Sequence, residues 1–163
     1  MTGQGPLPAE GTRGRRVGDR DRAFMRQITR AQLRVMRATG GRLLGRMGGH
    51  PVLTLTTTGW RSGQEFSTPV IGIADGDDWL IVASHGGAVS NPRWLRNVVS
   101  NPRVKVRVGA GGPVTMRARI LPPGERAEWW PRLAGAYPAY ATMQGRTDRE
   151  LAVVRLTRGE RET

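Results

Sequence analysis

Apolar and polar residues alternate along most of the chain beyond Val52, the pattern of β-strands with one buried face. Short connections rich in Gly, Asp and Pro separate the alternating runs and predict turns. Six strands are expected, over residues 52–58, 64–74, 79–84, 103–109, 114–121 and 151–156. The fold class is therefore mainly β with helices (α+β), and a small six-stranded antiparallel barrel, closed or split, accommodates these strands.

Three helical segments follow the third strand. Asn91 and Pro92 are typical of a helix N-cap and first helical position, which predicts a helix over 92–100 that stops before Pro102. Two further helices are expected over 125–136 and 138–145. These segments interrupt the strand pattern late in the chain, so we expect them to pack on the barrel.

A longer amphipathic helix is predicted before the strands, over 21–47. Its apolar positions share one side of a helical wheel, and a stripe of arginines lies opposite. Three interpretations are open: packing on the barrel, contact with an anionic membrane surface, or nucleic-acid binding. No aromatic residue alternates with the arginines and no recognition motif follows, so specific nucleic-acid binding is not expected.

Composition adds a strong positive charge to this picture. The 163 residues include no cysteine and carry a net charge of +13, of which residues 1–50 hold +8, from 11 arginines against three acids. One domain is expected, with a disordered basic tail over 1–20, the amphipathic helix over 21–47, a barrel over 48–158 and a tail over 159–163. No apolar run is long enough to cross a membrane, so a cytoplasmic location is expected, with peripheral contact at the inner membrane face through 21–47.

Two irregular joints between strands are candidate ligand sites. The turn at 59–63, Gly-Trp-Arg-Ser-Gly, combines two glycines, a cation and a hydroxyl, which suits a phosphate cradle as well as an ordinary hairpin connection. The loop at 84–87, Ser-His-Gly-Gly, follows the third strand. With two histidines, no cysteine and no paired carboxylates in helical register, no metal site and no hydrolase are predicted.

Three blocks of sequence resemble, in order, the deazaflavin-dependent nitroreductase family of actinobacterial oxidoreductases. They are LTTTGWRSGQ at 55–64, IVASHGGAVSNPRWLRNVVSNPRVKVRVG at 81–109 and WPRLAGAYPAYATMQGRTDRELAVV at 130–154. The resemblance covers about residues 43–157. It implies an FMN-binding-like split barrel that binds coenzyme F420 and takes a small-molecule substrate, and it permits a homodimer.

The resemblance also implies which residues form the site. The phosphate region and tail of F420 would lie near the turn and the loop, and the deazaflavin ring in the barrel groove. The implied cofactor-binding residues are Trp60, Arg61, Ser62, Phe66, Ser67, Thr68, Pro69, Val70, Ile71, Val82, Ala83, Ser84, His85, Arg93, Trp94, Leu95, Arg96, Asn97 and Tyr140. The candidate catalytic proton donors are Tyr140, Tyr137 and Ser84.

The expected reaction is transfer of a hydride from reduced F420 to an enone, quinone or nitro compound, with the cofactor carrying the chemistry. The chain departs from the family at Trp60, where a cation is usual, and at His85, Phe66 and Met143. These departures leave open an FMN-binding split barrel. A non-catalytic protein that binds a cofactor or a membrane surface is the remaining alternative.

Overall fold

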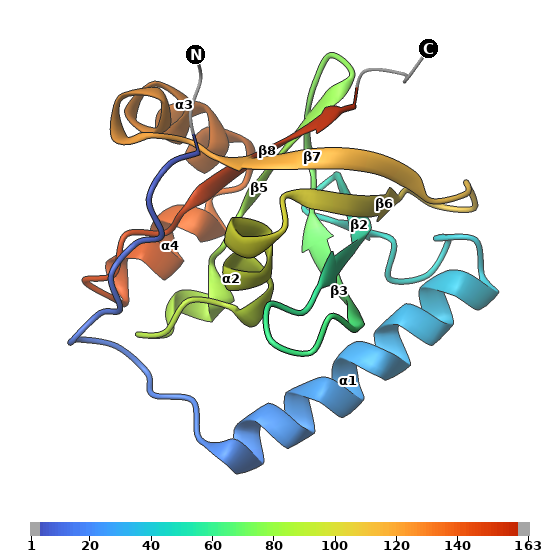
Figure 1. The fold of residues 1–163 in the computed structure, drawn as a ribbon, viewed down its shortest axis with the longest axis horizontal. Helices are drawn as coiled ribbons and strands as arrows, with labels where there is room; N and C mark the ends of the chain where they lie inside the picture. The colour runs from blue at the N-terminus through green and yellow to red at the C-terminus, as the bar shows by residue number, and fades with distance from the viewer. Residues whose placement is uncertain (1–3, 160–163) are drawn as a thin grey trace.

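One antiparallel sheet dominates the computed structural model, which describes residues 4–159 (Figure 1). Its strands lie in the order β1-β2-β6-β7-β8-β5-β4, and β3 pairs with the other edge of β2. The bounds are β1 Arg46–Met47, β2 His50–Thr58, β3 Glu65–Ile71, β4 Ile73–Asp75, β5 Asp78–Val82, β6 Arg103–Arg107, β7 Val114–Ile120 and β8 Val153–Arg158. The predicted α+β fold is confirmed. The expected 64–74 strand is divided into β3 and β4, and β1 is an additional two-residue strand.

Gly72 closes the sheet into a barrel. It interrupts one long strand, whose first part, β3, pairs with β2 and whose second part, β4, pairs with β5. Its N–H donates to Pro51 O at 3.0 Å. A Cβ at this position would lie 2.7 Å from Leu53 Cδ1 and 2.8 Å from Trp79 Cε3. The barrel therefore requires a residue without a side chain where the strand crosses from one edge of the sheet to the other.

Replacing Gly72 with alanine should destabilise the barrel. The added methyl group would force Leu53 and Trp79 to shift inside a packed core, at a cost of about 1–3 kcal/mol. Urea unfolding followed by far-UV circular dichroism measures this change. Gly124→Ala, in α3 (Pro123–Ala136), is the matched control, because a Cβ at that position would have no heavy atom within 4 Å. Equal stability of the two variants would contradict the role of Gly72 in closure.

Helices fill and cover the barrel. Trp94, Leu95 and Val98 of α2 (Arg93–Ser100) pack in the main core with inward residues of β2, β5, β6, β7 and β8. On the opposite face of β5 and β8, a second cluster contains Leu133 of α3 and Tyr140 of α4 (Ala139–Gly145). The stretches 80–82 of β5 and 153–154 of β8 are thus buried on both faces, which agrees with their short continuous apolar runs.

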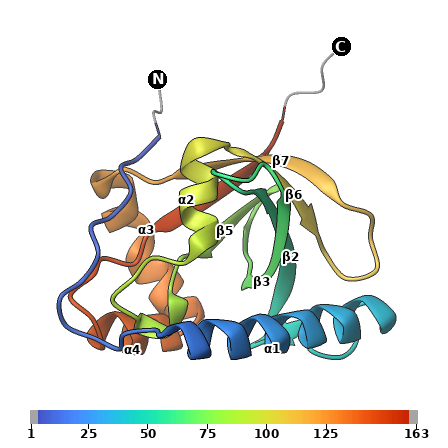
Figure 2. The same ribbon diagram turned by 60° about the horizontal axis from the view of Figure 1, so that its bottom comes forward.

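The N-terminal helix α1 (Asp19–Ala38) lies along one side of the barrel, near β3 (Figures 1 and 2). Met36 is its one buried residue, whereas Phe24 is 66% exposed and Met25 and Ile28 are also exposed. The helix is shorter than the predicted 21–47 because Gly40 and Gly41 adopt positive φ angles of 58° and 80° and turn the chain. Packing on the barrel, the first of the three interpretations, therefore applies only near the C-terminal end of α1.

Residues 4–18 run along the outside of the domain (Figure 1) and differ from the disordered tail expected over 1–20. Gly5 N donates to Ile120 O and Gly11 N to Val89 O, and Leu7 packs against the main core. We call residues 4–15 the strap. Composition favoured disorder because the strap has few apolar residues. The strap is held by main-chain hydrogen bonds, which leave no apolar pattern in the sequence. Residues 1–3 and 160–163 lie outside the described residues, and the proposed domain boundaries stay predictions.

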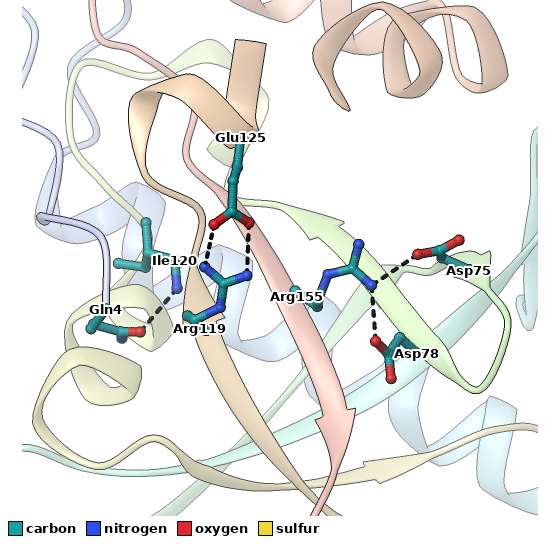
Figure 3. Close-up of polar contacts among 7 residues, drawn as sticks. All are labelled: Gln4, Asp75, Asp78, Arg119, Ile120, Glu125 and Arg155. Carbon is teal, nitrogen blue, oxygen red and sulfur yellow. Dashed lines mark hydrogen bonds and ion pairs between the residues drawn. The ribbon is translucent and has the colours of Figure 1, made fainter. Parts of the chain in front are cut away.

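The strap and two ion-pair groups meet on the outer side of β7 and β8 (Figure 3). Gln4 Oε1 accepts from Ile120 N at 3.1 Å. Nearby, Arg119 makes a two-point contact with Glu125 at 3.0 and 2.8 Å, and Arg155 Nη1 donates to Asp75 at 2.9 Å and Asp78 at 2.8 Å. Much of the positive charge of this sheet face is therefore neutralised locally.

Candidate functional site

The turn at 59–63 is held against α2 by Asn97. The side-chain Oδ1 of Asn97 accepts from Trp60 N at 3.1 Å, and its Nδ2 donates to the Thr57 hydroxyl at 3.0 Å. Asn97 is only 5% exposed, so it braces the turn from within and does not present its amide to a ligand. The turn is thereby fixed relative to the helix before any ligand binds.

Two arginines contact the ring of Trp60, which lies on this turn. The guanidinium of Arg61 lies 4.2 Å from the Trp60 ring centroid, and that of Arg96, from α2, lies 4.9 Å from it. Both distances fit cation–π contacts. The aromatic residue that replaces the usual cation therefore brings together two cations that are 35 positions apart in the sequence. This cluster suits an anionic ligand, because guanidinium groups bind phosphate and carboxylate with two donors.

The loop at 83–88 follows β5 and has an unusual main-chain conformation. Ser84 has a right-handed helical main-chain conformation. The next three residues, His85, Gly86 and Gly87, have positive φ angles of 45°, 62° and 78°. His85 Nδ1 lies 3.0 Å from Ser90 O. The pKa of His85 is lowered, chiefly by partial desolvation of an imidazole that still has an exposed surface, and further by positive charges including Arg149. At neutral pH His85 is therefore a neutral hydrogen-bonding group.

Several predicted cofactor residues lie inside the barrel. The side chains of Val82, Ala83, Trp94 and Leu95 belong to the buried clusters, so in this structure only their main-chain atoms face the loops. The side chain of Leu95 is completely buried, and its place among the cofactor-binding residues stays a prediction. Other predicted residues are accessible: Ser62, Phe66, Ser67 and Arg93 are exposed, and Thr68, Pro69, Val70 and Ile71 are half-buried along the β3 edge.

Tyr137 and Tyr140 meet where α3 ends and α4 begins. Their ring centroids are 4.9 Å apart in an edge-to-face arrangement, and Tyr140 is only 3% exposed. Burial raises the pKa of Tyr140, and Tyr137 raises it further. Tyr140 is a core residue in this structure and stays protonated over the physiological range. Tyr137, half-buried against Gly48, and Ser84, half-buried beside the loop, are the more accessible of the three predicted donors.

Neither of two cavities outlined among residues 4–159 is lined by a predicted site residue. The larger, about 490 Å³, lies over β7 and β8 and contains Arg117, Arg119 and Arg155. Two of these arginines already contact carboxylates, as Figure 3 shows, which weakens the case for an anion site there. The smaller, about 100 Å³, includes Lys105, which forms an ion pair with Glu65 at 2.6 Å. The candidate site is therefore formed by the turn at 59–63 and the loop at 83–88, and not by either cavity.

Sequence reasoning missed Asp148 and Arg149, which hold the loop and the strap. The carboxylate of Asp148 accepts from the Thr12 hydroxyl, from Thr12 N at 2.8 Å and from Arg13 N at 2.9 Å. Asn91, expected to cap α2, instead donates to Pro8 O, and Pro92 occupies the N-cap position. The available signal was the polar cluster Thr-Asp-Arg at 147–149 just before an apolar strand, but nothing in the sequence identifies its partners.

The strap should loosen in acid. Its hydrogen bonds from Thr12 and Arg13 lower the pKa of Asp148 from 3.8 to about 2, so its contribution is complete above about pH 4 and is lost as the pH falls toward 2. Hydrogen exchange of residues 11–15, corrected for intrinsic rates, should therefore accelerate between pH 4 and pH 2. Asp148→Asn should accelerate it at pH 7. Asp77→Asn, in the exposed β4–β5 hairpin, is the control, and an Asp148→Asn variant with unchanged exchange would contradict the role of this carboxylate.

A closed antiparallel barrel with helices on both faces, and two braced loops suited to an anion, place the chain among the split-barrel oxidoreductases. The chain belongs to the F420H(2)-dependent quinone reductase family, whose model matches residues 28–158. An F420H(2)-dependent quinone reductase of Mycobacterium tuberculosis is 35% identical over 135 residues, covering 81% of this chain and 91% of that protein. The resemblance to F420-dependent reductases is thus confirmed at the level of the family.

Two solved structures agree with this assignment. An F420-H2 dependent reductase (FDR-A) has a TM-score of 0.58 and 36% identity and covers 65% of this chain and 93% of its own. A structure described as a domain-swapped dimer has a TM-score of 0.60 and 31% identity, covering 83% and 98%. No helix within residues 4–159 combines the length and apolar character needed to span a bilayer.

Proposed function

We propose that this protein is an F420-dependent oxidoreductase that reduces quinone-like, electron-poor small molecules. The observation that carries the proposal is the Trp60 cluster, in which Arg61 and Arg96 are gathered on a turn braced by Asn97, within the family-matched region. F420 has a phosphodiester and a glutamate tail, and a pre-arranged pair of guanidinium groups suits both anions. The donor set therefore fits the cofactor that the relatives' names state.

Each part of the site has a distinct task in this proposal. Arg61 and Arg96 would bind anionic groups of the cofactor, the loop at 84–87 would receive a further one, and the β3 edge would line the ring. When bound, reduced F420 would supply a hydride, and a quinone that takes up this hydride and one proton would leave as the hydroquinone. The protein holds the reactants close together and excludes water.

The three candidate proton donors differ in exposure. Tyr140 is buried and its raised pKa makes it a poor acid, so it would support Tyr137 through their edge-to-face contact. Tyr137 and Ser84 are half-buried and would be the candidates to donate a hydrogen bond to the acceptor oxygen. Tyr137→Phe and Ser84→Ala, compared by kcat, separate the two.

The proposed function is tested by binding and turnover together. Titration of the full chain with F420 and with FMN, followed by quenching of its five tryptophans, should show binding of F420 with higher affinity. Oxidation of reduced F420 should then depend on both protein and a quinone such as menadione. Preferential binding of FMN would favour the flavin alternative. Absence of binding by either cofactor would favour a non-catalytic protein.

Peripheral membrane contact through 21–47 is a further part of the proposal. The exposed Phe24, Met25 and Ile28 of α1 share the helix with arginines, a combination that suits the surface of an anionic bilayer. Flotation with vesicles containing anionic lipid should carry the protein upward, and Phe24→Ser with Met25→Ser should abolish this. Vesicles of neutral lipid are the control. Retention of the double variant on anionic vesicles would assign the contact to arginine charge alone.

A homodimer is also proposed, supported by the relative whose structure is a domain-swapped dimer. The exposed apolar residues of α1 offer a surface that a second copy could cover. Light scattering during size-exclusion chromatography measures the mass directly, against 17.9 kDa for one chain. A monomer at all concentrations would leave α1 available for the membrane.

A further inference from the structure

Arg149 is an arginine buried in the domain, with 1% of its surface exposed. It lies just before β8 and reaches the loop after β5. Its Nε donates to Ala88 O at 2.9 Å, Nη1 to Ala83 O at 3.0 Å and Nη2 to Ser84 O at 2.8 Å. Nη1 also donates to Asn91 Oδ1 at 3.2 Å. One guanidinium therefore ties both ends of the loop together through four neutral acceptors.

The charge of this guanidinium has no ion-pair partner among residues 4–159. No carboxylate oxygen of the described residues lies within 4.0 Å of it, and Glu10 is the acid whose charge acts on it from a greater distance. Burial lowers the pKa of Arg149, but an arginine stays charged at neutral pH. Burying an unpaired charge is costly, but removing the guanidinium would leave the carbonyls of Ala83, Ser84 and Ala88 without this donor. The buried charge also makes the electrostatic potential at the loop more positive, which favours a bound anion.

The loop that Arg149 holds has the main-chain shape of an anion-binding nest. Ser84 has a right-handed helical conformation (φ −72°, ψ −40°), and the next residue, His85, has a left-handed one (φ 45°). This succession turns consecutive N–H groups toward one point. Within the described part of the chain, the N–H groups of Ser84, His85 and Gly86 donate to no other protein group, whereas those of Gly87 and Ala88 are used within the loop. Three donors are thus free to bind an anion.

We propose that Arg149 is a positioning residue, which holds residues 84–86 as a nest for a phosphate group of the bound cofactor. By holding the carbonyls of Ala83, Ser84 and Ala88, it leaves the neighbouring N–H groups for the ligand. It also stabilises the left-handed conformation of His85, which is unfavourable for a residue with a side chain. The inference rests on the proposed function, because the cofactor supplies the anion.

The first experiment uses inorganic phosphate and no cofactor. In ¹⁵N-labelled wild-type protein, the amide signals of Ser84, His85 and Gly86 should shift saturably as phosphate is added. In Arg149→Lys, which keeps the charge but loses the forked geometry, the apparent Kd should rise by about 10-fold. Arg146→Lys is the matched control, because it makes the same change at an exposed arginine three residues away. An equal effect of Arg146→Lys would overturn the proposal, because the geometry of Arg149 would then not be what matters.

The second experiment separates positioning from general loosening. Arg149→Met should weaken F420 binding by about 10- to 100-fold, but binding of the deazaflavin nucleoside without phosphate by less than about threefold. A merely structural role would weaken both ligands equally. The imidazole pKa of His85, measured by NMR without any ligand, should also rise in Arg149→Met, because a nearby positive charge is removed.

The outcomes can be distinguished from failure of the proposed function. If the wild-type amides of residues 84–86 do not respond to phosphate, the nest is refuted whether or not the Arg149 variants fold. If they respond but the protein binds no F420, the nest stands and the F420 assignment fails. Equal losses for F420 and for the phosphate-free nucleoside would reduce Arg149 to a packing role.

Discussion

Replacing Arg61 with alanine is expected to raise the Kd of F420 by about 10- to 100-fold. A charge-assisted hydrogen bond to a phosphate or carboxylate contributes about 1.5–3 kcal/mol, which corresponds to this range. In the structure, the Arg61 guanidinium stacks on Trp60 at 4.2 Å, and this contact reduces the rotamer entropy that is lost on binding. Fluorescence titration at fixed ionic strength measures the change, and its size should shrink as salt is added.

Two variants test whether this effect is local. Arg132→Ala removes an exposed arginine from α3, which packs in the second cluster on the far face of β5 and β8, and should leave the Kd nearly unchanged. Trp60→Ala keeps both cations but removes the ring on which Arg61 and Arg96 rest, and should weaken binding by an intermediate factor. If Arg61→Ala binds F420 as tightly as the wild type, Arg61 does not contact the cofactor.

The strands of the barrel could be predicted because their burial follows a local pattern. Val104 and Val106 alternate with Lys105 and Arg107, and in the structure the two valines are buried in the core. The joint at Gly72 was less accessible to prediction. A glycine within an apolar run looks the same in the sequence whether it bends a strand or ends it. Only the contacts with Leu53 and Trp79 show that Gly72 bends the strand.

The site was predictable only where the chemistry lies within a short segment. The turn at 59–63 carries its glycines, cation and hydroxyl together, and the resemblance located it. By contrast, the sequence cannot show which side of α2 faces the core, so Leu95 and Asn97 were grouped with Arg93 and Arg96. Arg149 is one of 25 arginines, and no local feature distinguishes a buried one. Its partners lie about 60 positions away, a relation that only the folded chain reveals.

The strap and the Trp60 turn have a common design. Each is an irregular segment with little apolar content, and in each a polar side chain, Asp148 or Asn97, accepts hydrogen bonds from main-chain N–H groups. Such side chains act as local substitutes for sheet or helix hydrogen bonds. The rigidity of the candidate site therefore depends on a few polar residues, and their loss should affect ligand binding and stability together.

Asn97→Ala is expected to lower both stability and F420 affinity. The substitution would leave the Thr57 hydroxyl, which is buried, and the Trp60 N–H without their partner. Each orphaned buried group costs about 1–3 kcal/mol, so a loss of about 2–4 kcal/mol in the free energy of unfolding is expected. The turn would also no longer be tied to α2, which should separate Arg61 from Arg96 and weaken F420 binding. Urea unfolding and fluorescence titration measure the two effects.

A double-mutant cycle with Thr57→Val identifies the cause. Valine has nearly the shape of threonine but no hydroxyl, so in this background Asn97→Ala leaves one fewer orphaned group and should cost about 1 kcal/mol less. The loss of F420 affinity should persist in the double variant, because it depends on the Trp60 N–H bond and not on Thr57. Strictly additive stability changes would show that Asn97 and Thr57 do not act through their hydrogen bond, and unchanged affinity would show that the turn keeps its place without Asn97.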